Sequence, residues 1–119
     1  KEGLLMANFV DFDSMYGHRR NAQGYAQCLE DFDSMLGELL PLLQDDELLM
    51  ITSDHGNDPT MSGTDHTREE VPLVAYSPGL TESTDLGTRK TFADLGQTIM
   101  DNFDAGKLPF GTSFLNDLK

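Results

Sequence analysis

The amino-acid sequence predicts an α/β fold in which a parallel sheet is flanked by helices. Two short apolar runs, residues 4–10 and 47–52, each lead abruptly into acidic residues, which is typical of strands buried on both faces. Between them, residues 21–43 repeat apolar side chains with the spacing of one helical face. A strand, a helix and a second strand in this order form a βαβ unit, in which the strands are parallel and the crossover is right-handed.

The first strand and the helix follow directly from their residue patterns. Residues 4–10 read LLMANFV, and Asp11 and Asp13 come at the carboxyl end of this run. Pro41 and the acidic sequence that follows predict the end of the helix and a turn. The helix should pack against another element through an apolar face made of Tyr25, Cys28, Leu29, Phe32, Met35, Leu36, Leu39, Leu40 and Leu43.

Two further strands are expected after this helix. Residues 47–52 read ELLMIT, and residues 71–76 read VPLVAY. Pro72 lies near the start of the latter run, where a missing hydrogen-bond donor is tolerated. Residues 77–90 are rich in Gly, Ser and Thr and are expected to form an exposed loop.

A second helix is predicted in the last third of the chain. Thr91 and Asp94 form a capping-box pattern that opens a helix running to about residue 103. Its inward side chains are expected to be Leu95, Ile99 and Met100. Residues 104–119 contain Gly, Pro and Phe, and they are expected to be irregular apart from one short turn.

Length and composition indicate one compact domain. The chain has 119 residues, 38% of them hydrophobic, and no apolar run near the roughly 18 residues that span a bilayer, so no membrane partner is expected. A net charge of −13 argues against a nucleic-acid partner, because binding to phosphates draws on clustered Lys and Arg. The lone Cys28 cannot form an internal disulfide, and no secretory signal is visible, which favours the cytoplasm.

All three histidines lie in short acid-rich loops, as His18 after Asp13, His55 after Asp54, and His66 after Asp65. Imidazole together with carboxylate is the ligand set that Mn, Zn and Fe prefer, whereas Mg and Ca favour oxygen alone. Because the carboxyl ends of parallel strands meet at one edge of a sheet, the loops after residues 10 and 52 should converge there. The pattern therefore predicts a metal cluster.

A plainer interpretation stays open at this point. Aspartate is a common turn former, and neighbours such as Asp54 and His55 point apart unless a turn at Gly56 redirects them. Three arginines lie within two positions of a histidine, where guanidinium groups suit a small anionic substrate but also simply offset nearby carboxylates. These three are Arg19, Arg20 and Arg68.

Three segments together resemble a known family: VDFDSMYGHRR at 10–20, ITSDHGNDPT at 51–60 and GTDHTREEVP at 63–72. Nearly the whole chain is similar to the carboxyl-terminal part of bacterial phosphopentomutases, which belong to the alkaline phosphatase superfamily. The Asp-His-Gly motif is shared across that superfamily, including cofactor-independent phosphoglycerate mutases. Gly-His-Arg-Arg and Asp-His-Thr-Arg-Glu look specific to the pentomutase branch.

The resemblance implies a partial three-layer alkaline-phosphatase-like core and a centre of two Mn²⁺ ions that bridges a phosphorylated threonine. The family interconverts ribose or deoxyribose 1-phosphate and 5-phosphate, an isomerase reaction of nucleoside catabolism. By motif, one ion would be bound by Asp13, His18 and His66, and the other by Asp54 and His55.

The arginines are assigned less closely by the resemblance. Arg68 would contact the phosphate or support a ligand, and Arg19 and Arg20 would do the same or pair with carboxylates. Three other aspartates are expected only to orient histidines or to form turns, namely Asp11, Asp58 and Asp65.

The chain also departs from the family, whose members carry a further metal-binding Asp, the threonine nucleophile and a cap domain. None of these has a counterpart here, so no catalytic nucleophile is assigned. Residues 1–119 are expected to be a C-terminal fragment of the metal-binding core domain, without mutase activity, that self-associates through an exposed sheet edge. The alternatives are a relative of phosphoglycerate mutase, another metal phosphatase of the superfamily, or a stand-alone metal-binding or interaction module.

Overall fold

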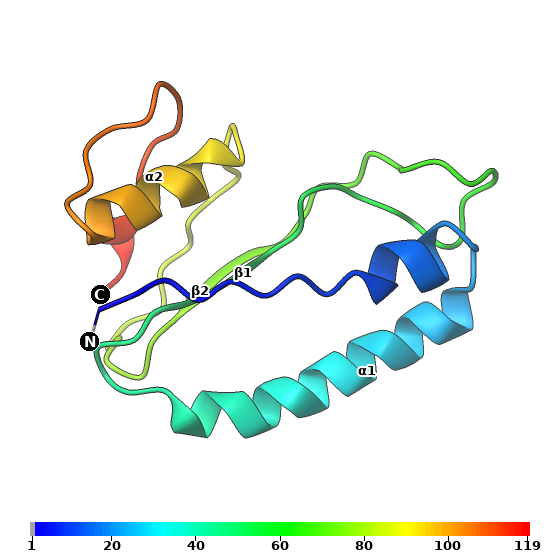
Figure 1. Cartoon of the computed structure of the whole chain (residues 1–119), viewed down its shortest axis with the longest axis horizontal. Coiled ribbons are helices and arrows are strands. Elements are labelled where there is room, and N and C mark those ends of the chain that lie inside the picture. The colour runs from blue at the N-terminus through cyan, green and yellow to red at the C-terminus, as the bar shows by residue number, and fades with distance from the viewer. Residues whose placement is uncertain (1) are drawn as a thin grey trace. The chain divides into compact units, whose positions relative to one another are not determined.

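The computed structural model describes residues 2–119, which form two compact units (Figure 1). The first unit contains the chain up to Leu42 together with Thr52–Leu73, and the second contains Leu43–Ile51 together with Val74–Lys119. The elements along the chain are a π-helical turn η1 (Phe12–Gly17), α1 (Ala22–Leu39), η2 (Leu40–Leu42), β1 (Leu49–Thr52), β2 (Leu73–Tyr76), α2 (Ala93–Asn102) and η3 (Leu115–Asp117).

The long helix α1 forms where the apolar repeat predicts it. It begins after Asn21, whose side-chain oxygen accepts a hydrogen bond of 2.9 Å from the backbone N–H of Gly24. The predicted apolar face is half-buried along its length, except for Leu29, which is 50% exposed. The Phe32 ring packs edge-on against the ring of Phe9 at 5.2 Å. The periodicity therefore identified both the helix and the side that packs.

Residues 4–10, predicted as a parallel strand, form no strand. The segment is extended (Figure 1), and no backbone hydrogen bond joins residues 2–9 to the rest of the described chain. Leu5 and Met6 are 91% and 87% exposed. An apolar sequence favours a strand, but the strand forms only where a neighbouring chain completes the ladder. The predicted βαβ unit and parallel three-layer core are therefore not formed within residues 2–119.

This exposed apolar segment leads us to expect self-association of the chain. Replacing Leu5 by Lys adds a charge to the unpaired segment, so the mean mass measured by sedimentation equilibrium should fall toward the 13.2 kDa of one chain. Met61→Lys, at an exposed loop position, is the matched control and should leave the mass unchanged. A wild-type chain that is monomeric throughout the concentration series would refute this prediction.

The two observed strands form one two-stranded sheet and lie within the predicted ranges 47–52 and 71–76. The intervening segment returns directly, and it contains an antiparallel bridge between Gly56 and Thr67. A direct return of this kind makes an antiparallel pair, since parallel neighbours need a long crossover. This hairpin-like return brings the first part of the polar loop, which follows β1, next to its last part, which precedes β2.

The second helix, α2, forms at the predicted place but turns a polar face inward. Asp94, Gln97 and Thr98 are buried, whereas the predicted inward residues Leu95, Ile99 and Met100 are only half-buried. The Thr98 hydroxyl donates to the backbone oxygen of Asp94 at 2.8 Å and accepts from the backbone N–H of Phe114 at 3.0 Å. Phe114 is fully buried, so this polar face anchors the C-terminal tail.

The predicted capping box is only half right. Thr91 Oγ1 accepts a hydrogen bond from the N–H of Ala93 at 3.2 Å, as a capping side chain does. The Asp94 carboxylate instead pairs with Arg89 at 2.7 Å and accepts from the N–H of Thr112 at 2.8 Å. The half-buried guanidinium of Arg89 outcompetes the local backbone for this carboxylate, because a charge-assisted hydrogen bond is stronger. The short turn predicted in the tail is confirmed as η3. Among the described helices, none is both long and apolar enough to cross a membrane.

Candidate metal centre

The π-helical turn η1 explains how Asp13 and His18 share one face. The backbone N–H of His18 donates to the backbone oxygen of Asp13 at 2.9 Å, which is the five-residue hydrogen bond of a π-helix. Residues five apart are then stacked along the turn, and His18 Nε2 lies 3.3 Å from Asp13 Oδ2. The turn is held on α1 by the edge-on contact of Phe12 with Tyr25 at 5.5 Å. Asp13 and His18, whose five-residue spacing would separate them on an α-helix, therefore form a close pair on the π-helical turn.

The loop between β1 and β2 supplies the other two histidines. Its antiparallel bridge between Gly56 and Thr67 makes His55 and His66 diagonal neighbours across the two strands of the loop, and their rings stack with centroids 3.7 Å apart. A side chain at Gly56 would not fit, since a Cβ there would lie 2.9 Å from the backbone nitrogen of Glu69. This glycine permits the close approach that brings the two imidazoles together.

Asp13, His18 and His66 form the tightest group of candidate ligands. Their ligand atoms all lie within 4.8 Å of one another. His66 Nε2 is 3.3 Å from Asp13 Oδ1 and 3.1 Å from His18 Nε2. Nδ1 of His18 donates a hydrogen bond to the backbone oxygen of Thr64, since a carbonyl oxygen can only accept, and Nε2 is the ring nitrogen that faces the group.

These spacings fit a divalent ion. An ion about 2.0–2.2 Å from each ligand atom sets neighbouring ligand atoms about 2.8–3.6 Å apart in octahedral or tetrahedral geometry. The 3.1 Å between the two imidazole nitrogens falls inside that interval, and so does the 3.3 Å from each nitrogen to its nearer Asp13 oxygen, which is Oδ2 for His18 and Oδ1 for His66. One carboxylate and two imidazoles are also the donor set of intermediate metals rather than of Mg or Ca. Asp13, His18 and His66 are therefore a group that could hold a divalent ion.

The Asp13 carboxylate is held in its ionised form. Partial burial raises the pKa of Asp13, but the hydrogen bond from Asn57 and the three neighbouring imidazoles lower it by more, so its pKa lies below the ordinary value. The side-chain nitrogen of Asn57 donates to Asp13 Oδ1 at 2.7 Å. The ionised carboxylate supplies the negative charge that a cation site requires.

The second predicted ligand pair is less enclosed. His55 Nε2 lies 3.7 Å from Asp54 Oδ1 and 3.8 Å from Asp13 Oδ1, and the Asp54 side chain is 89% exposed. His55 is therefore almost equally close to the two carboxylates. The two ligand sets inferred from the sequence lie side by side, with Asp13 next to both.

The three arginines fall into two kinds of position. Arg19 and Arg68 are exposed, and neither makes an ion pair with another described residue. Arg20 is half-buried, and its hydrogen bonds all go to backbone oxygens or to Asn57. Arg19 and Arg68 remain available for an anion, whereas Arg20 is already engaged within the protein.

Asn57 was not anticipated from the sequence, although it is the most buried polar residue of this cluster, with 9% exposure. The signal that could have found it is Gly17, where an added Cβ would lie 2.5 Å from Asn57 Nδ2. A glycine just before a candidate ligand indicates that something approaches the backbone closely. Of the other aspartates, Asp58 acts as a turn former, since its carboxylate accepts from the backbone N–H and the hydroxyl of Thr60.

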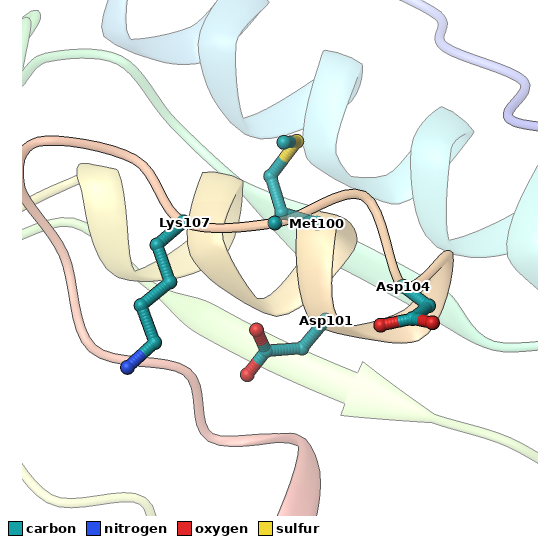
Figure 2. A pocket seen from close by; sticks show the side chains of 5 residues that line it. Met100, Asp101, Asp104 and Lys107 are labelled. Atoms are coloured by element: carbon teal, nitrogen blue, oxygen red, sulfur yellow. The ribbon is translucent and has the colours of Figure 1, made fainter.

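A hollow at the end of α2 offers no comparable arrangement. It is lined by Met100, Asp101, Asp104, Gly106 and Lys107. Figure 2 shows the Lys107 ammonium and the Asp104 carboxylate on opposite sides, with Asp101 between them. Asp101 already accepts a hydrogen bond of 2.7 Å from the side chain of Gln97. The polar groups that line this hollow do not converge on a common point.

Comparison with known proteins agrees with the chemistry of the cluster. The model of the Metalloenzyme superfamily matches residues 1–107. Over 117 residues, the chain is 56% identical to a phosphopentomutase from Levilactobacillus brevis. The match covers 98% of this chain and 30% of that protein, so the chain spans about 30% of the length of this relative.

Proposed function

We propose that this chain, which belongs to the Metalloenzyme superfamily, is the part of a phosphopentomutase that binds a divalent metal ion through Asp13, His18 and His66. The observation that carries the proposal is the gathering of one carboxylate and two imidazoles within 4.8 Å. It is supported by 56% identity to a phosphopentomutase over nearly the whole chain.

We propose for the whole protein the interconversion of ribose or deoxyribose 1-phosphate and 5-phosphate, through a phosphothreonine that lies outside this chain. Two Mn²⁺ ions are proposed, the second held by Asp54 and His55 with ligands from elsewhere in the protein. A pair of bound divalent ions stabilises the attacking and leaving oxygens of an in-line phosphoryl transfer. The partner is therefore a small sugar phosphate, in keeping with an acidic chain that suits neither DNA nor RNA.

The residues of this chain would hold and orient the reacting groups. Asp13 would supply the negative charge, with its Oδ1 held by Asn57, and His18 would present Nε2 because its Nδ1 is tied to the backbone oxygen of Thr64. Arg68 and Arg19 follow the ligands His66 and His18 closely in sequence and expose their guanidinium groups. We assign them to the phosphate of the substrate, since a guanidinium binds phosphate oxygens in pairs.

The finer points of fold and compartment belong to the same proposal. Residues 1–119 would be the C-terminal fragment of the metal-binding core, and the exposed segment 4–10 would become a strand of a three-layer parallel core once other strands flank it. We propose a cytoplasmic location because the one cysteine of this chain, Cys28, is an unpaired thiol.

The ligand assignment can be tested by calorimetric titration of the chain with Mn²⁺. His66→Ala removes one imidazole from the cluster and should weaken Mn²⁺ binding by at least about tenfold. Loss of a residue that only orients a metal ligand already costs that much. Thr64→Ala changes the same loop but keeps the backbone oxygen that holds His18, so its binding curve should match the wild type. Identical curves for His66→Ala and the wild type would refute the assignment.

The isolated chain is expected to show no mutase activity with ribose 5-phosphate, because no residue in it is assigned as the phosphorylated nucleophile. A coupled assay for ribose 1-phosphate, run with and without Mn²⁺, measures this directly. The matched positive control is the whole protein that contains this chain. Sustained turnover by the 119-residue chain alone would show that the nucleophile lies within it.

A further inference from the structure

We propose that Arg20 and Asn57 are positioning residues for the metal centre: Asn57 orients the Asp13 carboxylate, and Arg20 fixes the loop that carries His66. This inference rests on the proposed function, because it concerns the same ligands. Neither residue is proposed to touch the ion or the substrate. Their effect would be transmitted through hydrogen bonds to Asp13 and to the backbone of the loop.

Asn57 uses both ends of its amide. Its nitrogen donates to Asp13 Oδ1 at 2.7 Å, and its oxygen accepts from Arg20 Nη1 at 2.6 Å. The reverse amide orientation would set oxygen against carboxylate and nitrogen against guanidinium, so the observed orientation is the only satisfied one. Because Asn57 is buried and sits against Gly17, the amide has little room to turn. The Asp13 oxygen that faces His55 and His66 is thereby held in one place.

Arg20 binds the loop from several sides. Its Nε donates to the backbone oxygen of Gly63 at 2.7 Å, its Nη1 to that of Asp58 at 2.9 Å, and its Nη2 to that of Asp65. Nη1 also reaches the backbone oxygen of Gly17 at 3.1 Å. The planar guanidinium therefore joins the η1 turn to the loop that ends at His66. An ammonium group is a single point donor and cannot reproduce this fork.

The backbone at Arg20 supports a specific requirement for this residue. Its φ of 51° lies in the left-handed region, which is unfavourable for any residue other than glycine. The loop between Asp58 and Asp65 has no helix or strand of its own. Hydrogen bonds from Arg20 take the place of regular structure, and the same loop provides the Thr64 oxygen that holds His18. By fixing the loop, Arg20 therefore positions His66, which the loop carries, and His18, which the backbone oxygen of Thr64 holds.

Electrostatic repulsion and ligand positioning predict opposite effects of Arg20→Ala on Mn²⁺ binding. A positive charge beside a cation site repels the cation, so Arg20→Ala should strengthen Mn²⁺ binding if electrostatics alone matter. If Arg20 positions the ligands, Arg20→Ala should weaken binding, by about 10- to 100-fold, which is the range for residues that orient metal ligands. Arg20→Lys keeps the charge and removes the fork, so it should also weaken binding.

The experiment is calorimetric titration of the 119-residue chain with Mn²⁺, accompanied by the visible absorption spectrum with Co²⁺. We expect weaker Mn²⁺ binding and an altered Co²⁺ spectrum for Arg20→Lys, Arg20→Ala and Asn57→Ala, with an unchanged helical circular dichroism signal. Lys90→Ala removes an exposed cation of the second unit and should change neither readout.

The outcomes separate this inference from the proposed function. A wild-type chain that binds no Mn²⁺ contradicts the proposed function and, with it, the inference. A wild-type chain that binds Mn²⁺, with Arg20→Lys and Asn57→Ala binding equally well, contradicts the inference alone. Weaker binding that goes with a lost helical signal in both variants means that the two residues serve the fold, and this also overturns the positioning role.

Discussion

Replacing Asp13 by Asn is expected to weaken Mn²⁺ binding to the chain by about 100-fold or more, which is above the range for residues that merely orient ligands. Among the residues that the structure describes, Asp13 is the one carboxylate within 4 Å of all three imidazoles: 3.3 Å from His18, 3.8 Å from His55 and 3.3 Å from His66. Asparagine keeps the shape and the hydrogen bond from Asn57 but loses the negative charge. The loss should appear directly in a calorimetric titration.

Asp11→Asn is the matched control for this substitution. Asp11 precedes the same turn, is exposed, and makes no capping hydrogen bond through its side chain. Its removal lowers the net negative charge by the same amount, so any general effect of charge on cation binding appears equally in both variants. Equal losses for Asp11→Asn and Asp13→Asn would mean that the chain attracts Mn²⁺ only through its overall charge.

Replacing Asp94 by Ala is expected to destabilise the second unit by about 3 kcal/mol, the lower end of the range for breaking a buried ion pair. The substitution leaves the guanidinium of Arg89 and the backbone N–H of Thr112 without their partner. It also loosens the support of Phe114, over whose ring the Arg89 guanidinium lies at 5.6 Å. Chemical denaturation followed by tyrosine fluorescence or circular dichroism measures the change. Glu82→Ala, an exposed carboxylate of the same unit, should stay within about 0.5 kcal/mol.

The same ion pair predicts an acid-sensitive step. Burial raises the pKa of Asp94, but the Thr112 N–H and Arg89 lower it by more, so the folded pKa lies below the ordinary 3.8. The stabilisation is then fully present above pH 3.8 and is lost as the pH falls through the lowered folded value. The difference in unfolding free energy between wild type and Asp94→Ala should shrink in that window. A difference that is constant down to pH 2 would contradict the pairing.

Patterns of apolar residues predicted the elements that depend on nearby residues. The repeat from Tyr25 to Leu43 identified α1, and the short runs at 47–52 and 71–76 contain β1 and β2. These predictions hold because a helical face and a hairpin strand are written into the segment itself. The predicted inward residues of α2 are half-buried like those of α1, but the burial of Asp94 was missed, since no hydrophobic pattern records its pairing with Arg89.

Features that depend on distant residues could not be predicted in the same way. Residues 4–10 have the composition of a buried strand, but a strand needs a neighbour, and none pairs with it within residues 2–119. The π-helical hydrogen bond from His18 to Asp13 is a local departure from the α-helical period and leaves no repeat in the sequence. The role of Asn57 follows from a contact across more than forty positions, which only the folded chain reveals.

The most direct test of the metal centre is anomalous X-ray diffraction at the manganese absorption edge, from crystals of the chain grown with Mn²⁺. We expect an anomalous peak at coordination distance, about 2 Å, from the carboxylate of Asp13 and from Nε2 of both His18 and His66. A manganese peak elsewhere on the molecule, with these three side chains left without one, would contradict it.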